Sequence, residues 1–294
     1  MTMPTSVIDR IGHLAIRVRD IDAAVREAVE VMGMREVRRD GDCVYLRLGA
    51  EHHSLQYIAA EEDGLDHLGL QAAGAAGMQA VRARVAAEGL RVVSDGPLDA
   101  GLADGFAFVG PDDVTYEVYV GMEQGQPPYH PTGIRPARLG HFTMHPQDPP
   151  AVCAFLQRVL GFRVSDTVGA DGFFLRCNSE HHGIGLFRGR GTLHHHAWEV
   201  QSLGEIGRLA DLLGEQRRRP LWGPIRHGVG NNIALYFLEP AGSVVEYYAD
   251  MEHIYDEASF ETRAWDAENT WWWSRWAEQR PDGFRDHGLI PRGR

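Results

Sequence analysis

Two stretches decide the fold of this chain: IGHLAIRVRDIDAAVREAVEVMGMREV at residues 11–37 and LGHFTMHPQDPPAVCAFLQRVLGFRV at residues 139–164. Each starts with alternating polar and apolar residues around a Gly-His pair, which predicts a strand. Each then continues into an amphipathic segment, such as AAVREAVEVMG, which predicts a helix. The second stretch follows the first at an offset of 128 residues, as from His13 to His141. We therefore expect two copies of one structural module.

Three further pairs of segments repeat at offsets of 128 or 129 residues. They are RLGAEHHSLQYI (47–58) and RCNSEHHGIGLF (176–187), LDHLGLQ (65–71) and HHHAWEV (194–200), and GPDDVTYEVYV (110–120) and EPAGSVVEYYA (239–249). Within each copy, a strand, a helix and about three strands follow one another twice, separated by turn residues. This order predicts an α+β fold of tandem βαβββ units, two per domain, whose antiparallel-rich sheets curl around a site.

The repeats divide the chain into an N-terminal domain at 1–128, a C-terminal domain at 129–250 and a tail at 251–294. A Pro- and Gly-rich linker at 121–138 separates the two copies. The tail fits neither copy, and its aromatic residues predict either a lid or a subunit interface. Five tryptophans lie in it: Trp265, Trp271, Trp272, Trp273 and Trp276.

The composition is that of a folded globular protein, with 44% hydrophobic and 24% charged residues in 294. A net charge of -12 and the lack of a basic stripe argue against a nucleic-acid partner. Cys43, Cys153 and Cys177 lie far apart without a CxxC pair, so we expect a reducing, cytoplasmic location. No segment reads as a membrane span or a signal peptide. The expected partners are small molecules and further copies of the chain in a homo-oligomer.

His141, His195 and Glu246 are the candidate metal ligands, because each lies on an alternating strand segment of the second copy. Two imidazoles and one carboxylate that leave other positions open form the facial arrangement typical of non-haem Fe(II) oxygenases. Each of these residues, taken alone, is more simply explained as a buried structural histidine or a surface glutamate. The set of three favours a metal site.

The segment IRHGVGNNIALYFLEPAGSVVE at 225–246 carries His227, Tyr236, Pro240, Gly242 and Glu246 at fixed spacings. It closely resembles the signature of type I extradiol ring-cleavage dioxygenases, members of the vicinal oxygen chelate superfamily, and the resemblance extends over residues 1 to 250. It implies a non-haem Fe(II) site, with Mn(II) as the other metal this ligand set accepts, and no organic cofactor. It also implies the cleavage of a catechol-type diol by dioxygen in the catabolism of aromatic hydrocarbons.

The resemblance implies that the histidine of the second copy's first strand, the second histidine of a later pair and the terminal glutamate bind the metal. These are His141, His195 and Glu246. The triple His194-His195-His196 leaves the middle ligand ambiguous by one position. When Glu199 and Val200 are aligned with the last two residues of the family's HHxxxEV-like strands, the ligand position falls on His195. Strand alternation agrees, since His194 and His196 are expected to face away from the site.

Three further residues carry over from the resemblance as catalytic candidates: His182, His227 and Tyr236. A neutral imidazole near pH 7 can accept and then donate a proton, and we assign this role to His182. Tyr236 and His227 are expected to stabilise the anionic substrate oxygen by hydrogen bonding. Taken singly, His182 could also be a polar residue at a strand end, His227 a loop residue and Tyr236 a core residue.

Two alternatives come from other functional classes. One is a metal enzyme of the glyoxalase or epimerase kind on the same fold, but such enzymes usually use another glutamate and do not need Tyr236. The other is a metal-free small-molecule binding protein of the same superfamily, which should lack the metal ligands. The presence of ligand types in both copies argues against it.

The first copy carries His13, His67 and Glu117 at the positions of the three ligands, and His53 at the position of His182. The segment GPLDAGLADGFAFVG at 96–110 contains no histidine or tyrosine to match His227 and Tyr236. We therefore expect no catalysis in the first domain. The sequence leaves open whether these residues bind a second metal ion or form a structural relic.

The tail segment TRAWDAENTWWWSRW at 262–276 loosely resembles the lid of the homoprotocatechuate 2,3-dioxygenase subgroup, in which arginines hold the substrate carboxylate. Trp222 and the tryptophan run stand near the places of those arginines, and Thr143 replaces an asparagine. We expect a bulkier or more apolar ring substituent than carboxymethyl, with Arg226 and Arg275 as residues that could reach an anion.

Overall fold

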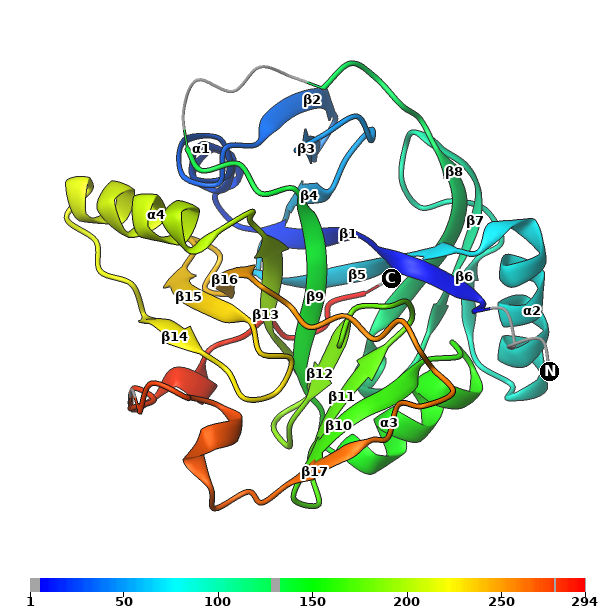
Figure 1. The fold of residues 1–294 in the computed structure, drawn as a ribbon. Coiled ribbons are helices and arrows are strands. Elements are labelled where there is room, and N and C mark those ends of the chain that lie inside the picture. Colours follow the sequence, from blue (N-terminus) through cyan, green and yellow to red (C-terminus); the bar gives the residue numbers. More distant parts are fainter. Residues whose placement is uncertain (1–5, 128–132, 278, 294) are drawn as a thin grey trace.

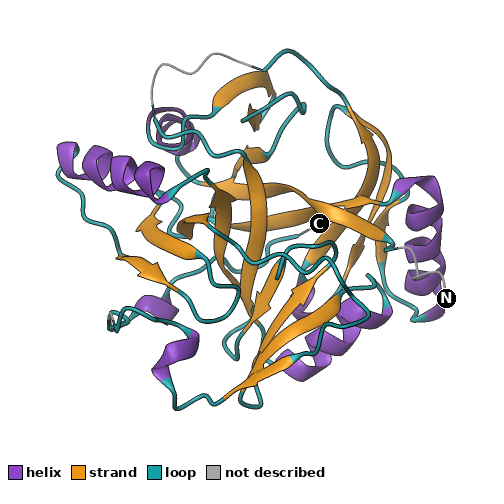
Figure 2. Ribbon diagram, viewed as in Figure 1, coloured by secondary structure: helices purple, strands orange, loops and turns teal. Residues whose placement is uncertain are grey.

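The computed structural model describes residues 6–127, 133–277 and 279–293. Its strands form two sheets, one from each copy of the repeat, and the helices lie on the outside of the molecule (Figures 1 and 2). The predicted domain boundary between 128 and 129 lies outside the described residues.

The first module consists of two βαβββ units. The first unit contains β1 (Ile8–Val18), α1 (Ile21–Glu30), β2 (Arg35–Asp40), β3 (Cys43–Arg47) and β4 (Leu55–Ala59). The second contains β5 (Gly64–Ala72), α2 (Gly74–Ala87), β6 (Val92–Ser94), β7 (Leu102–Val109), a 3-10 turn (Pro111–Asp113) and β8 (Thr115–Met122). The strand order β2-β3-β4-β1-β5-β8-β7-β6 joins the two units through β1 and β5 at the centre of the sheet.

The second module repeats this plan. Its first unit contains β9 (Arg138–His145), α3 (Pro149–Arg158), β10 (Arg163–Val168), β11 (Gly172–Arg176) and β12 (Ile184–Leu186). Its second unit contains β13 (Thr192–Glu199), α4 (Leu203–Glu215), β14 (Trp222–Arg226), β15 (Ile233–Leu238) and β16 (Val244–Ala249). The order is β14-β15-β16-β13-β9-β12-β11-β10, with β17 (Arg263–Trp265) of the tail added at the edge. The predicted α+β fold of tandem βαβββ units is confirmed.

The repeat extends to the signals that begin and end the helices. Asp20 and Asp148 are the N-caps of α1 and α3, and their carboxylates accept hydrogen bonds from the backbone N–H of Ala23 and Ala151. Such caps satisfy N–H groups that have no partner inside the helix. After each helix the chain turns at a glycine with positive φ, Gly33 at 66° and Gly161 at 71°.

The centre of each sheet brings the predicted ligands together. In the second module, Ala197 of β13 lies between His141 of β9 and Glu246 of β16 in the strand register. In the first module, Gly69 of β5 lies in the same way between His13 and Glu117. A Cβ atom at Gly69 would lie 2.2 Å from the His13 ring, so this position requires glycine. Three neighbouring strands therefore aim their side chains at one point in each module.

A buried carboxylate joins the modules. Glu239, between β15 and β16, accepts a hydrogen bond of 2.8 Å from the Tyr57 hydroxyl of the first module. Its other oxygen lies 3.3 Å from His196 Nε2. A second contact runs from Arg218 to Glu27 of α1 at 2.8 Å. The apolar core is likewise continuous across both modules.

The tail runs over the second module and then returns to both sheets. β17 pairs in parallel with β10, and later Leu289 exchanges backbone hydrogen bonds with Leu193 of β13. The next residue, Ile290, accepts a hydrogen bond from the N–H of Leu65 on β5. Figure 1 shows this red segment reaching the middle of the molecule. Within the described residues, no helix is long and apolar enough to cross a membrane.

Replacing Tyr57 with Phe tests the contact between the modules. The change leaves a buried carboxylate oxygen of Glu239 without its donor, so we expect the free energy of unfolding to fall by about 1–3 kcal/mol. Chemical denaturation followed by circular dichroism measures the change. The control is Tyr255→Phe, because Tyr255 is 81% exposed. Equal midpoints for the two variants would contradict the assigned role of Tyr57.

Candidate metal centre

The three predicted ligands of the second module converge in the structure. Glu246 Oε2 lies 3.1 Å from His141 Nε2 and 3.1 Å from His195 Nε2. One ligand atom from each residue lies within 4.8 Å of the other two, and all three side chains are buried. The neighbouring strands β9, β13 and β16 each supply one of them. Two imidazole nitrogens and one carboxylate oxygen therefore lie close enough together to bind one metal ion.

The histidine triple divides into three different environments. Of the three, only His195 is close to Glu246. His194 instead shares a hydrogen bond between its Nδ1 and the Nδ1 of His195, and its Nε2 lies 2.7 Å from the carbonyl oxygen of Phe284. His196 points to the other side, where its Nδ1 accepts a hydrogen bond from the indole of Trp198. His196 thus faces away from the site as expected.

The same expectation is wrong for His194, which lines the pocket beside the site. The reason is a shift in the β9–β13 register between Leu193 and His195. A bulge of this kind interrupts strict alternation and re-aims one side chain. Sequence alternation alone does not reveal it.

The Glu246 carboxylate is charged in this setting. Burial alone would favour the neutral acid, but the imidazoles of His141 and His195 hold the pKa of Glu246 well below its ordinary value. The other oxygen of the carboxylate accepts a hydrogen bond of 3.1 Å from the Asn232 side chain. Asn232 therefore fixes which oxygen faces the imidazoles, and residue type alone did not single it out.

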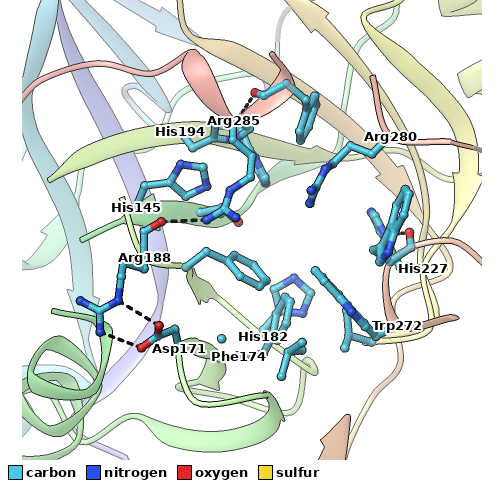
Figure 3. A pocket seen from close by; sticks show the side chains of 18 of the residues that line it. His145, Asp171, Phe174, His182, Arg188, His194, His227, Trp272, Arg280 and Arg285 are labelled. Carbon is cyan, nitrogen blue, oxygen red and sulfur yellow. Dashed lines mark hydrogen bonds and ion pairs between the residues drawn. The ribbon is translucent and has the colours of Figure 1, made fainter. Parts of the chain in front are cut away.

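A pocket of about 390 Å³ opens beside the three ligands. Figure 3 shows His227 and Trp272 on one wall, with Arg188 and Asp171 on the opposite wall. Much of the lining is aromatic: Phe174, Phe187, Trp222, Trp272, Trp273 and Phe284. Thr143 also lines the pocket. A flat apolar molecule therefore fits next to the ligand set.

His182 lies against the ligand set, with its ring centroid 4.5 Å from that of His141 and 5.0 Å from that of Phe174. Burial, together with the neighbouring His141, lowers the pKa of His182 well below its ordinary value, so the ring is neutral. Its Nδ1 lies 3.0 Å from Nδ1 of His181. His181 Nε2 in turn lies 3.3 Å from Asp166 Oδ2, at an ion-pair distance without a well-formed hydrogen bond.

His227 and Tyr236 form a hydrogen-bonded pair in the pocket wall. His227 Nδ1 lies 2.7 Å from the carbonyl oxygen of Trp273, so this nitrogen carries a proton and donates it. Desolvation lowers the pKa of His227, which keeps the ring neutral and leaves Nε2 as an acceptor. The Tyr236 hydroxyl donates to that Nε2 at 2.8 Å. The tail backbone therefore fixes the tautomer of His227.

The arginines singled out from the sequence lie away from this pocket. Arg226 contacts the backbone of Asn231 and the carboxylate of Asp250, and neither Arg226 nor Arg275 lines the pocket. Arg188, Arg280 and Arg285 line it instead. Asp171 forms an ion pair with Arg188 and so balances the charge of that arginine. Arg280 and Arg285 therefore give the pocket its remaining positive charge.

In the first module, His13, His67 and Glu117 also come together, and His53 lies beside them. A fourth residue that the sequence analysis passed over, Asp99, joins the cluster. The available signal was the repeat offset itself, because Asp99 precedes His227 by 128 residues. The residue at the place that matches His227 is an aspartate, which is neither of the residue types expected there.

Comparisons with known proteins agree with this architecture. The model of the family described as "Glyoxalase/Bleomycin resistance protein/Dioxygenase superfamily" matches residues 138–247. A manganese-dependent 2,3-dihydroxybiphenyl 1,2-dioxygenase of Geobacillus genomosp. 3 is 25% identical over 279 residues, covering 86% of this chain and 88% of the relative.

Two solved structures share the fold along almost the whole chain. A Mn(II)-bound glyoxalase from Novosphingobium aromaticivorans superimposes with a TM-score of 0.89 at 29% identity, covering 98% of this chain and 97% of the other. Homoprotocatechuate 2,3-dioxygenase from Arthrobacter globiformis gives 0.90 at 24% identity, covering 98% and 94%. The chain therefore has the two-module vicinal oxygen chelate fold over almost its whole length, and the curated relatives that it matches along most of its length are extradiol dioxygenases.

Proposed function

We propose that this protein cleaves the aromatic ring of a catechol-type diol next to its two hydroxyl groups, using dioxygen at a metal site in the second module. The observation that carries the proposal is the convergence of His141, His195 and Glu246 beside a pocket lined by His182, His227 and Tyr236. The curated relatives support it, since their names describe dioxygenases of aromatic diols.

The donor set fits Fe(II), and Mn(II) equally. The two imidazoles and the carboxylate all line the pocket, so a metal held by these three residues would leave ligand positions for substrate and dioxygen. One carboxylate leaves a divalent ion with a net positive charge, which favours binding of an anionic diol. When bound, the metal supplies a path for electrons from the aromatic ring to dioxygen.

Tyr236 and His227 provide a route for a substrate proton. The Tyr236 proton is directed at His227 Nε2, so the tyrosine oxygen is available to accept a hydrogen bond from a substrate hydroxyl. Burial and the charge of Glu246 raise the pKa of Tyr236 well above its ordinary value, so the phenol stays protonated and does not act as a standing base. The pair can therefore draw the hydroxyl proton toward His227 as the diol becomes an anion.

His182 is the second acid–base group. The Nε2 atom of His181 faces Asp166 and is the place for the proton of that ring. His181 Nδ1 is then an acceptor, and the Nδ1–H of His182 donates to it. His182 Nε2 is then the unprotonated nitrogen, in a ring packed between His141 and Phe174. In this tautomer His182 can take up a proton and return it during the reaction.

The Mn(II)-bound glyoxalase with the same fold represents the alternative chemistry on this scaffold. Isomerisation of that kind would need a further carboxylate at the site. Among the described residues that line the pocket, the acidic ones are Glu246 and Asp171, and Asp171 is paired with Arg188. The pair of Tyr236 and His227 favours the dioxygenase.

The lining of the pocket supports an aromatic substituent on the catechol. Trp222 stacks on Tyr236 with ring centroids 5.5 Å apart, and Trp272 stacks on Phe187 at 5.4 Å. The two stacked aromatic pairs make the apolar wall of the pocket larger than the ring of an unsubstituted catechol would cover. Arg280 and Arg285 lie on the same pocket and suit an oxygen-rich end of a longer substrate.

We further infer a cytoplasmic homo-oligomer without a nucleic-acid partner. Cys43, Cys153 and Cys177 form no disulfide in the described part of the chain, and the net charge of -12 repels phosphate backbones. Two tail tryptophans, Trp271 and Trp276, are 59% and 47% exposed and offer a surface for contact between copies.

Replacing Glu246 with Gln tests the metal site and the reaction together. After anaerobic loading with Fe(II), the unmodified protein should turn a catechol panel yellow when air is admitted, with uptake of oxygen. E246Q should bind Fe(II) about 100-fold more weakly or worse, because even changes outside the ligand set cost about 10- to 100-fold. The control E268Q alters an exposed tail residue and should behave as the unmodified protein. Absence of oxygen uptake with every diol would refute the proposal.

Replacing His227 with Phe separates proton movement from metal binding. The variant loses the acceptor for Tyr236, so we expect Fe(II) content to stay unchanged while kcat falls by about 100- to 1000-fold. Metal analysis and single-turnover kinetics measure the two quantities. The control H253F changes an exposed histidine outside the pocket. A fully active H227F enzyme would contradict the assigned role.

A comparison of two substrates tests the expected substituent. The aromatic lining should give 2,3-dihydroxybiphenyl a kcat/KM at least about tenfold above that of 3,4-dihydroxyphenylacetate, a difference of ~1.4 kcal/mol. Unsubstituted catechol serves as the common reference. The opposite order would show that Arg280 and Arg285 select an anionic substituent.

A further inference from the structure

The first module contains a second set of converging ligand atoms, separate from the pocket. His13 and His67, on β1 and β5, meet Glu117 of β8 and Asp99 of the loop before β7. All four side chains have no solvent exposure. The four residues belong to different segments and are brought together only by the fold.

Five of the six distances among the four facing atoms are those expected of ligands around one metal ion. His13 Nε2 lies 2.9 Å from Glu117 Oε2, 3.1 Å from Asp99 Oδ2 and 3.3 Å from His67 Nε2. His67 Nε2 lies 3.1 Å from the same Asp99 oxygen and 3.5 Å from the same Glu117 oxygen. The sixth separation, between the Asp99 and Glu117 oxygens, is within 4.8 Å. The five measured separations match the edges of a tetrahedron whose centre lies about 2.0 Å from each corner, which is the length of a zinc–nitrogen or zinc–oxygen bond.

Hydrogen bonds within the cluster account for only part of this arrangement. Each Nε2 atom can donate one hydrogen, yet His13 Nε2 faces another imidazole nitrogen and two carboxylate oxygens. Among the described residues, Glu117 Oε2 is buried without a hydrogen-bond partner, and so is Asp99 Oδ1. Buried polar atoms are seldom left in this state. A divalent cation at the centre would be bound by all four facing atoms and would balance both carboxylates.

The surroundings of His67 have the form expected around a metal ligand. Its Nδ1 lies 2.8 Å from Asp66 Oδ1, and Arg17 holds the other Asp66 oxygen at 2.7 Å. A histidine that binds a metal commonly donates its second ring N–H to a carboxylate, which fixes the tautomer and leaves Nε2 as the ligand. On Glu117, Oε1 accepts the N–H of Leu98, as Glu246 accepts from Asn232.

Comparison of the modules explains why this site differs from the catalytic one. Asp99 stands at the repeat position of His227 and occupies a fourth ligand position. In the strand register, Ala107 faces Glu117 where Tyr236 faces Glu246. The position that the second module leaves open to its pocket is therefore closed by a carboxylate in the first.

We propose that the first module binds its own divalent metal ion through His13, His67, Asp99 and Glu117 in a closed structural site. Two neutral imidazoles and two carboxylates make a neutral four-coordinate complex, which suits Zn²⁺. Because all four positions belong to the protein, the ion does no ring chemistry and instead ties β1, β5, β8 and the Asp99 loop together. Its complete burial makes exchange slow.

Metal counting in matched variants tests this site. The protein is produced with iron and zinc in the medium, and metal per chain is measured by mass spectrometry before and after long dialysis against EDTA. The unmodified protein should hold about two ions at first and about one, the buried one, after dialysis. E117Q should hold about one and lose it, whereas E246Q should hold about one and keep it.

A second readout identifies the coordination of the retained ion. E246Q produced with Co(II) in place of zinc should show the strong visible absorption of tetrahedral Co(II), and D99N in the E246Q background should lose it. Circular dichroism checks that each variant folds. If E117Q does not fold, D99N takes its place, since the amide keeps the size of the side chain.

The outcomes are distinct from those of the proposed ring cleavage. One ion per chain, lost in E246Q and retained in folded E117Q or D99N, would overturn the second site and leave the dioxygenase proposal standing. Two ions per chain with no oxygen uptake on any diol would support the second metal site and overturn the dioxygenase proposal.

Discussion

The placement of a charged glutamate between two buried imidazoles is the constraint on which the rest of the second module depends. Glu246 can be ionised inside the sheet only because His141, His195 and the amide of Asn232 face it. That requirement fixes the register of three strands, since Ala197 must lie between the two flanking ligand positions. The same constraint acts in the first module, where Gly69 takes the middle place and the His13 ring fills the space of the absent side chain.

Much of the fold could be predicted from the sequence because a duplicated chain supplies its own alignment. The repeat placed His13 and His141 at matching positions and gave the βαβββ order, and the structure has both of these. The convergence of His141, His195 and Glu246 also follows, since each stands at the same point of a repeating unit. Such features are local in sequence or repeat at a constant offset.

Other features depend on contacts that residue type does not encode. The bulge that turns His194 into the pocket is a property of strand register. Asn232 and Asp99 are common loop residues whose importance appears only when their partners are folded around them. Arg226 and Arg275 had suitable charge but are directed elsewhere, while Arg280 and Arg285 reach the pocket from a part of the tail without regular sequence pattern. Long-range geometry decided each of these cases.

The hydrogen bond between His227 and the carbonyl of Trp273 has a consequence for how the enzyme comes into being. The ribosome completes the second module before it has made the residue that sets the protonation of His227. Farther along, Leu289 and Ile290 bridge β13 and β5, so the order in which the chain is made is not the order in which the site becomes competent. A nascent chain could fold both sheets and bring His141, His195 and Glu246 together before the position of the proton on His227 is set.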